Sequence, residues 1–187
     1  RLLYTGRFDP AKGLLDMVKA VDILCKDGEE VLLDLVGWPE ERSDILAQIE
    51  STAATYGIQD RIVNHGYKSV GAELFNHYKE ADIYLLASQT SEGFPRTIWE
   101  AMAHSLPVVA TKVGSIPELI GDAAELVEPK NPAALAEGIK RVIHNKSLRS
   151  NYIIKGLNLA SQNTLEIQVS AMARVIKEWI KPGIGII

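Results

Sequence analysis

Short apolar runs alternate with longer amphipathic segments along most of this chain of 187 residues. Such alternation is typical of repeated strand, helix, strand units, in which the strands form a parallel sheet that the helices cover. The apolar runs predict strands at Leu2–Thr5, Val31–Val36, Ile62–Asn64, Ile83–Ala87, Val108–Ala110 and Glu125–Val127. We therefore expect an α/β fold with a parallel sheet of about six strands.

The segments between these strands have helical periodicity. Apolar residues recur at helical spacing in two of them, at Leu14, Val18, Val21 and Leu24 and at Ile45, Ile49 and Ala53. Asn131 followed by Pro132 is typical of a helix start. We expect C-terminal helices over about 147–181, and a single domain over 1–187, which is an ordinary domain length.

Charge and cysteine content restrict the class of protein. The chain has 20 basic and 24 acidic side chains, and this net charge of -4 argues against general binding to nucleic acid or to an anionic membrane. The single cysteine, Cys25, has no partner for an internal disulfide, so we expect a reducing, cytoplasmic location. No apolar run approaches the roughly 20 residues that span a bilayer.

Ligands of open parallel sheets bind beyond the carboxyl ends of the strands, so the turns there carry most of the functional information. Gly6, Arg7 and Lys12 follow the first predicted strand. Arg7 offers a planar fork for pairs of oxygens and Lys12 a point charge, and together they could neutralise a diphosphate. Two solvated surface cations would give the same spacing.

The next two turns carry weaker signals. Gly37 follows the second strand and permits a close backbone approach, although an ordinary turn explains it equally well. Tyr67 follows the third strand, where it could lie near a nucleobase. For His65 we expect local hydrogen bonding rather than catalysis, because no nucleophile or carboxylate stands beside it in the sequence.

The turn after the fourth strand is the most informative, because two glutamates bracket a helix start. Glu92 lies in the turn, and Glu100 lies one turn inside a helix that begins near Pro95. A helix start exposes backbone N–H groups suited to phosphate or sugar oxygens, and Pro95 itself has none. The available donors belong to Gly93, Phe94, Arg96 and Thr97. Arg96 and Glu100 could instead form a surface ion pair between positions i and i+4.

Two serines carry structural expectations. Ser115 and Glu118 have the spacing of a capping box, which makes Glu118 a structural residue. Ser105 precedes the fifth strand where a helix would end in a left-handed turn, and we expect modest strain there, of order 1–2 kcal/mol.

Four motifs in order carry a family resemblance. They are GR-x4-KG at Gly6 to Gly13, EGFP-x4-EAMA at Glu92 to Ala103, LPVVAT at Leu106 to Thr111 and VGSIPELI at Val113 to Ile120. The series resembles the carboxyl-terminal domain of a GT-B retaining glycosyltransferase of family four ("group 1"), from about Leu3 to Ala136 and more loosely to Trp179. This resemblance implies a Rossmann-like three-layer sandwich that forms one half of a GT-B enzyme.

The resemblance also implies the site residues. Arg7, Lys12 and Glu92 would act in catalysis, and Glu100 would accept hydrogen bonds from the ribose. The donor diphosphate would contact Gly6, Arg7, Lys12, Arg96 and Thr97. The donor sugar would contact Glu92, Gly93, Phe94, Pro95 and Arg96. Gly37 and Tyr67 would lie near the nucleobase. The family needs neither a metal nor a cofactor beyond the nucleoside-diphosphate sugar and retains the anomeric configuration.

We find no carboxylate suited to a covalent route, so departure and attack on the same face of the sugar are favoured, with Glu92 as an orienting group. Pro95 stands where the family often has a second glycine, which implies altered hydroxyl contacts rather than lost binding.

The resemblance places the acceptor site in an amino-terminal domain that these 187 residues do not contain. We expect this chain alone to bind donor weakly and to transfer little. The acceptor would be a glycan, a lipid-linked glycan or a small molecule, with possible peripheral association of the full-length enzyme at the inner face of the membrane. The apolar stripe of Leu165, Val169, Met172, Val175, Ile176 and Trp179 would then remain partly exposed.

Three alternatives stay open. A nucleotide-sugar epimerase of GT-B architecture would use the same diphosphate site, and a non-catalytic nucleotide-sugar-binding module would bind donor without transfer. A dinucleotide-dependent dehydrogenase is disfavoured, because no G-x-G-x-x-G follows the first strand.

Overall fold

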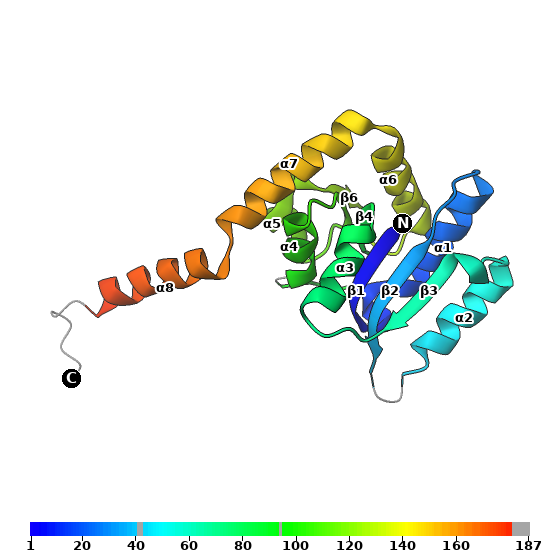
Figure 1. Ribbon diagram of the computed structural model, residues 1–187, viewed down its shortest axis with the longest axis horizontal. Helices are drawn as coiled ribbons and strands as arrows, with labels where there is room; N and C mark the ends of the chain where they lie inside the picture. Colours follow the sequence, from blue (N-terminus) through cyan, green and yellow to red (C-terminus); the bar gives the residue numbers. More distant parts are fainter. Residues whose placement is uncertain (41–42, 94, 181–187) are drawn as a thin grey trace.

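The computed structural model describes residues 1–40, 43–93 and 95–180, and it contains a six-stranded sheet in which neighbouring strands run parallel. The strand order is β3-β2-β1-β4-β5-β6 (Figure 1). The strands are β1 (Leu2–Phe8), β2 (Leu33–Pro39), β3 (Ile62–Gly66), β4 (Ile83–Leu86), β5 (Val108–Thr111) and β6 (Glu125–Val127). The predicted α/β class is confirmed, and the order is that of a Rossmann-like sheet.

Eight α-helices connect and extend these strands in the described part of the chain. They are α1 (Leu14–Lys26), α2 (Ile45–Tyr56), α3 (Ala72–Glu80), α4 (Arg96–Ala103), α5 (Ile116–Ile120), α6 (Pro132–His144), α7 (Lys146–Gln162) and α8 (Leu165–Trp179). Helix α1 packs against α2 and α6, whereas α4 packs against α7 and lies beside α3 (Figure 1). The sheet is therefore the middle layer of a three-layer sandwich.

Strand β1 is central, and its first residues Leu2, Leu3 and Tyr4 are almost completely buried. Burial on both faces is expected of a parallel strand covered by helices on either side. Strand β1 also marks the point at which the strand order reverses, because β2 and β3 lie to one side of it and β4 to β6 to the other. Crevices at such switch points are the usual ligand sites of these sheets.

Strand β1 is three residues longer than predicted, so Gly6 and Arg7 lie in the strand and not in the turn after it. Gly6 pairs with Gly37 of β2, which likewise lies within its strand. A Cβ on Gly37 would stand 1.7 Å from the Gly6 carbonyl oxygen. The two glycines let the strands continue in register where the sequence indicated a break.

The helix ends agree in part with expectation. Ser105 has a φ of 61° and so adopts the predicted left-handed conformation. Asn131 caps α6 as predicted, because its side chain accepts a hydrogen bond from the Ala134 N–H at 3.0 Å. The capping box at Ser115 is wrong: helix α5 has five residues, and the Ser115 side chain makes no cap hydrogen bond.

Helices α6, α7 and α8 form the predicted C-terminal helical region, although Lys181 lies outside the described residues. Helix α8 projects away from the sheet (Figure 1). Its large apolar residues are exposed, from 46% for Ile167 to 81% for Trp179, so the expected exposed hydrophobic surface is confirmed. None of the helices in the described ranges is long and apolar enough to cross a membrane.

Candidate functional site

The loops after β1 and β4 meet at the switch point of the sheet. Lys12 Nζ lies 2.5 Å from Glu92 Oε1, and the Gln89 N–H donates to the Ala11 carbonyl oxygen at 2.7 Å. Asp9 caps the short 3-10 helix (Pro10–Lys12) that carries Lys12, because its carboxylate accepts the Ala11 N–H at 2.8 Å. Two residues predicted to act in catalysis are thus brought into direct contact.

Glu92 is held by its side chain and by its backbone. The buried Ser88 hydroxyl donates to Oε1, the oxygen that Lys12 also contacts. The Ser115 N–H and hydroxyl both donate to the Glu92 carbonyl oxygen, at 3.0 and 3.1 Å. This contact explains why the capping box is absent: the Ser115 hydroxyl bonds to the Glu92 turn and not to its own helix.

Gly114 makes the contact with this turn possible. A Cβ there would stand 2.3 Å from the Glu92 carbonyl oxygen and 2.5 Å from its nitrogen, and Gly114 has a φ of 54°. A side chain at this position would therefore push the turn after β5 away from Glu92.

Arg7 is also paired with carboxylates. Its guanidinium lies 3.0 Å from Asp9 and 2.7 Å from Glu40, and its side chain is 47% exposed. Both cations predicted to bind a diphosphate therefore have internal carboxylate partners in this structure. An incoming anion would have to compete with Asp9, Glu40 and Glu92 for them.

Glu100 lines a pocket of about 170 Å³. The lining residues come from β1, β2, the segment after β3, α3 and α4: Thr5, Gly6, Val36, Gly37, Trp38, Tyr67, Lys68, Val70, Leu74, Arg96, Thr97 and Glu100. Gly6, Gly37, Tyr67, Arg96, Thr97 and Glu100, which the sequence placed in one site, therefore share one pocket.

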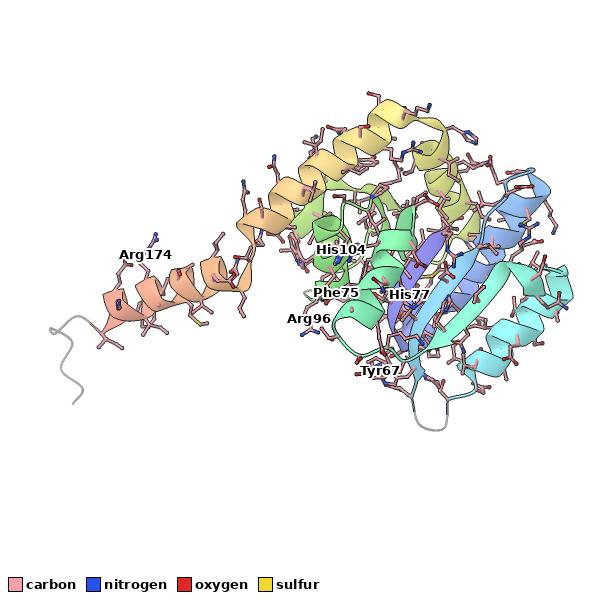
Figure 2. The ribbon with its side chains drawn as sticks, in the orientation of Figure 1. Tyr67, Phe75, His77, Arg96, His104 and Arg174 are labelled. Atoms are coloured by element: carbon pink, nitrogen blue, oxygen red, sulfur yellow. The ribbon has the colours of Figure 1, made fainter. Side chains whose placement is uncertain are left out.

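The alternative of a surface ion pair between Arg96 and Glu100 is not observed, because none of the ion pairs among the described residues joins them. Glu100 instead turns one oxygen toward the protein interior, where the Tyr78 hydroxyl donates to Oε2 at 2.8 Å. Arg96 lies at the start of α4 on the pocket side (Figure 2). Arg96 and Thr97, at the start of α4, therefore line the pocket together with Glu100.

Two exposed aromatic rings form the outer wall of this pocket. The rings of Trp38 and Tyr67 meet edge to face with centroids 5.3 Å apart, and their residues are 47% and 62% exposed. Sequence reasoning singled out Tyr67 but missed Trp38. The available signal was an aromatic residue directly after Gly37 at a strand end, where a base or sugar could stack.

The remaining predicted residues fall as follows. Pro95 is the residue directly before α4. The Gly93 carbonyl oxygen accepts a hydrogen bond from the Ser115 hydroxyl. Phe94 lies outside the described residues. His65 lies away from the pocket, and its Nε2 is 2.7 Å from the buried Asp34 carboxylate, so it makes the expected local hydrogen bond. Among the described residues, no group of three His, Cys, Asp or Glu side chains could hold a metal ion.

Burial changes the pKa values of two tyrosines beneath the pocket. It raises the pKa of Tyr84 to about 12 and raises the pKa of Tyr78 further, with the neighbouring Tyr84 adding to the effect on Tyr78. Both phenols therefore stay protonated at physiological pH. They act as hydrogen-bond donors under the floor of the site.

A family model described as glycosyl transferases group 1 matches residues 1–158. The chain belongs to this family. The amylovoran biosynthesis glycosyltransferase AmsK of Erwinia amylovora is 34% identical over 125 residues, which are 64% of this chain and 30% of AmsK. The recognised resemblance is therefore confirmed, and the chain spans about a third of this relative.

Solved structures share the fold. The C-terminal domain of a glycosyl transferase group 1 family protein (LpcC) from Francisella tularensis has a TM-score of 0.76 and 27% identity, covering 87% of this chain and 84% of that one. Anabaena Alr3699/HepE in complex with UDP and glucose has a TM-score of 0.85 and 23% identity, covering 95% of this chain and 48% of that one. The chain thus has the Rossmann-like fold of one half of a GT-B glycosyltransferase.

Proposed function

We propose that this chain is the donor-binding part of a glycosyltransferase that uses a nucleoside-diphosphate sugar and retains the anomeric configuration. The observation that carries the proposal is that the Lys12–Glu92 ion pair joins the loops after β1 and β4, and that Glu100 on α4, which follows the same β4 loop, lines a pocket with the ends of β1 and β2. Cationic and amide donors next to two carboxylates match a ligand with both phosphates and hydroxyls.

In this proposal, each part of the donor has its own group of residues, some in the pocket and some beside it. The base would lie near Gly37, against Trp38 and Tyr67, and the ribose would lie against Glu100. The diphosphate would contact Gly6, Arg7, Lys12, Arg96 and Thr97. The transferred sugar would contact Glu92, Gly93, Phe94, Pro95 and Arg96. Support for this order comes from the shared pocket of the base and ribose residues and from the separate contact of Glu92 with Lys12.

Lys12 and Arg7 are the residues that would supply catalysis. Negative charge develops on the nucleoside diphosphate as it leaves, and preorganised cations stabilise that charge without a metal. Departure and attack would take place on the same face of the sugar in one ion-pair-like transition state. Glu92, whose Oε1 is already engaged by Lys12 and Ser88, would orient the sugar rather than attack it.

The relatives support a nucleotide-sugar ligand, since HepE was solved with UDP and glucose. The acceptor would bind the part of a full-length enzyme that lies outside this chain. It would be a glycan, a lipid-linked glycan or a small molecule, met in the cytoplasm or at the inner face of a membrane. No cofactor is needed beyond the donor.

Thermal shift with uridine, guanosine and adenosine diphosphates tests the binding claim, because a ligand of the native state raises the melting temperature. We expect one nucleotide to stabilise the chain selectively, and Arg7→Ala and Glu100→Ala to reduce that shift. Glu92→Ala should weaken binding of the sugar-bearing donor and leave the bare diphosphate less affected. Glu137→Ala on the remote α6 is the matched control. Equal shifts for all four variants and the parent would refute the site.

Proton NMR of the product made by a full-length enzyme tests the stereochemistry. The anomeric configuration of the product should equal that of the donor. Free epimerised sugar would indicate an epimerase instead, and donor binding with no turnover would indicate a binding module.

A further inference from the structure

The buried hydroxyl group of Tyr78 lies under the proposed ribose site. Tyr78 is on α3, is 0% exposed, and donates its proton to Glu100 Oε2 on α4 at 2.8 Å. Thr5 Oγ1 of β1 lies 2.6 Å from the same phenol oxygen. Because a phenol has one proton and Glu100 receives it, the Thr5 hydroxyl must be the donor in the second bond. A directed chain of hydroxyls therefore runs from β1 through Tyr78 to Glu100.

Neighbouring rings fix the position of Tyr78. Its ring stacks on His104 with centroids 5.1 Å apart and an interplanar angle of 17°, and on Tyr84 at 5.9 Å and 24°. His104 follows α4, near Phe75 of α3 (Figure 2), and its Nδ1 bonds to the Glu100 carbonyl oxygen at 2.7 Å. The Phe75 ring of α3 also contacts His104, with centroids 5.2 Å apart. The phenol therefore has little freedom to turn away from Glu100.

The two carboxylate oxygens of Glu100 therefore have different surroundings. Oε2 is occupied by Tyr78, and no described residue donates to Oε1. The residue lines the pocket with Gly37, Thr97 and Tyr67. A carboxylate fixed through one oxygen presents the other at a set angle, which lowers the cost of ordering it when a ligand binds.

We propose that Tyr78 is a positioning residue that holds Glu100 so that its free oxygen accepts hydrogen bonds from the ribose hydroxyls of the nucleotide. The proposal rests on the proposed function, in which Glu100 binds the ribose. Tyr78 does not touch the ligand, and it acts through Glu100 alone.

The test compares a nucleoside diphosphate that binds the chain with its 2′,3′-dideoxy counterpart, which lacks both ribose hydroxyls. Calorimetry should show that the wild-type chain binds the ribonucleotide at least about tenfold more tightly, since hydrogen bonds to charged groups are strong. In Tyr78→Phe we expect this preference to fall below about threefold. A preference that is unchanged in a folded Tyr78→Phe chain would overturn the proposal for Tyr78 while leaving the role of Glu100 intact.

Tyr152→Phe is the matched control. Its hydroxyl donates to Glu125 Oε2 at 2.8 Å, so it also removes a tyrosine-to-glutamate bond, but it lies away from the pocket. This variant should keep the wild-type preference. A wild-type chain with no preference, together with Glu100→Ala binding as the parent does, would overturn both the ribose site and the role of Tyr78.

A measurement on the wild-type chain tests the proposal even if Tyr78→Phe does not fold. In carbon-13 NMR of a chain labelled at the tyrosine Cζ atoms, adding the ribonucleotide should shift the Tyr78 resonance. The ribose hydroxyls would donate to the same carboxylate that accepts the Tyr78 proton and so change that hydrogen bond. The dideoxy nucleotide should shift this resonance less. Equal shifts from the two nucleotides would overturn the proposal.

Discussion

Lys12 and Glu92, eighty positions apart in the sequence, form an ion pair of 2.5 Å across the switch point of the sheet. The pair neutralises a cation that the proposed function assigns to the diphosphate. Ligand binding would therefore exchange one anionic partner of Lys12 for another. The side chain of Lys12 is 26% exposed and that of Glu92 14%, so this exchange takes place in a partly desolvated site.

Lys12→Ala should weaken binding of the nucleoside diphosphate by about 10- to 100-fold, because a charge-assisted hydrogen bond is lost. Isothermal titration calorimetry measures the change. Lys140→Ala is the control, since Lys140 on α6 also pairs with a carboxylate, Asp27, at 2.8 Å. Equal affinity in Lys12→Ala and the parent would remove Lys12 from the site.

Gly37→Ala should unfold or strongly destabilise the chain. Its Cβ would stand 1.7 Å from the Gly6 carbonyl oxygen and 3.0 Å from the Phe8 ring, so β1 and β2 would have to separate. We expect a loss of at least about 3 kcal/mol in the free energy of unfolding. Gly57→Ala, with a φ of 69° and open space around it, should cost only about 1 kcal/mol. Urea denaturation of the two variants compares them, and similar midpoints would contradict the register of β1 and β2.

The sequence predicted the sheet and the loops of the site because both follow from local patterns. Apolar runs mark parallel strands, and polar turns after them must gather at one edge. It did not predict that Glu92 and Lys12 touch, since that contact depends on the order of strands. Tyr78 was missed for a related reason: in sequence it is one more aromatic residue of a helix. Its role depends on how α3 packs beside α4.

The length of β1 shows the limit of residue preferences. Gly6 ordinarily indicates the end of a strand, and the prediction stopped at Thr5. Here Gly6 faces Gly37, and two facing glycines allow the backbones to continue to Phe8. The pairing of two positions 31 residues apart decided the outcome, and no single window of sequence contains both.

Alkaline pH should destabilise the fold through its buried tyrosines. Burial raises the pKa of Tyr84 from 10.0 to about 12, so the folded chain holds this proton more tightly than the unfolded chain. The stability from this group is fully present below pH 10 and is lost as the pH rises toward 12. The pKa values of Tyr4 and Tyr78 are also raised by burial and add to the loss.

Urea denaturation at several values of pH from 9 to 12 measures this decline. The free energy of unfolding of Tyr84→Phe should decline less steeply with pH than that of the parent, because the variant lacks the phenolic proton of Tyr84. If the free energy of unfolding falls equally with pH in Tyr84→Phe and in the parent, Tyr84 does not contribute to the loss of stability at alkaline pH.

The exposed apolar face of α8 should make the chain self-associate or bind hydrophobic dyes. Met172 and Ile176 are 59% and 49% exposed, and they belong to the stripe that continues to Trp179 at 81%. Exposed apolar patches of this kind often mark contact surfaces. Sedimentation velocity should show a mass that rises with concentration in the parent chain. The double variant Met172→Lys with Ile176→Lys should stay monomeric, because two charges would have to be buried on contact.

Ser170→Lys with Ala173→Lys is the control, because it adds the same charge to exposed positions outside this stripe and should associate as the parent does. A parent chain that remains monomeric and binds no dye would show that this face is not adhesive.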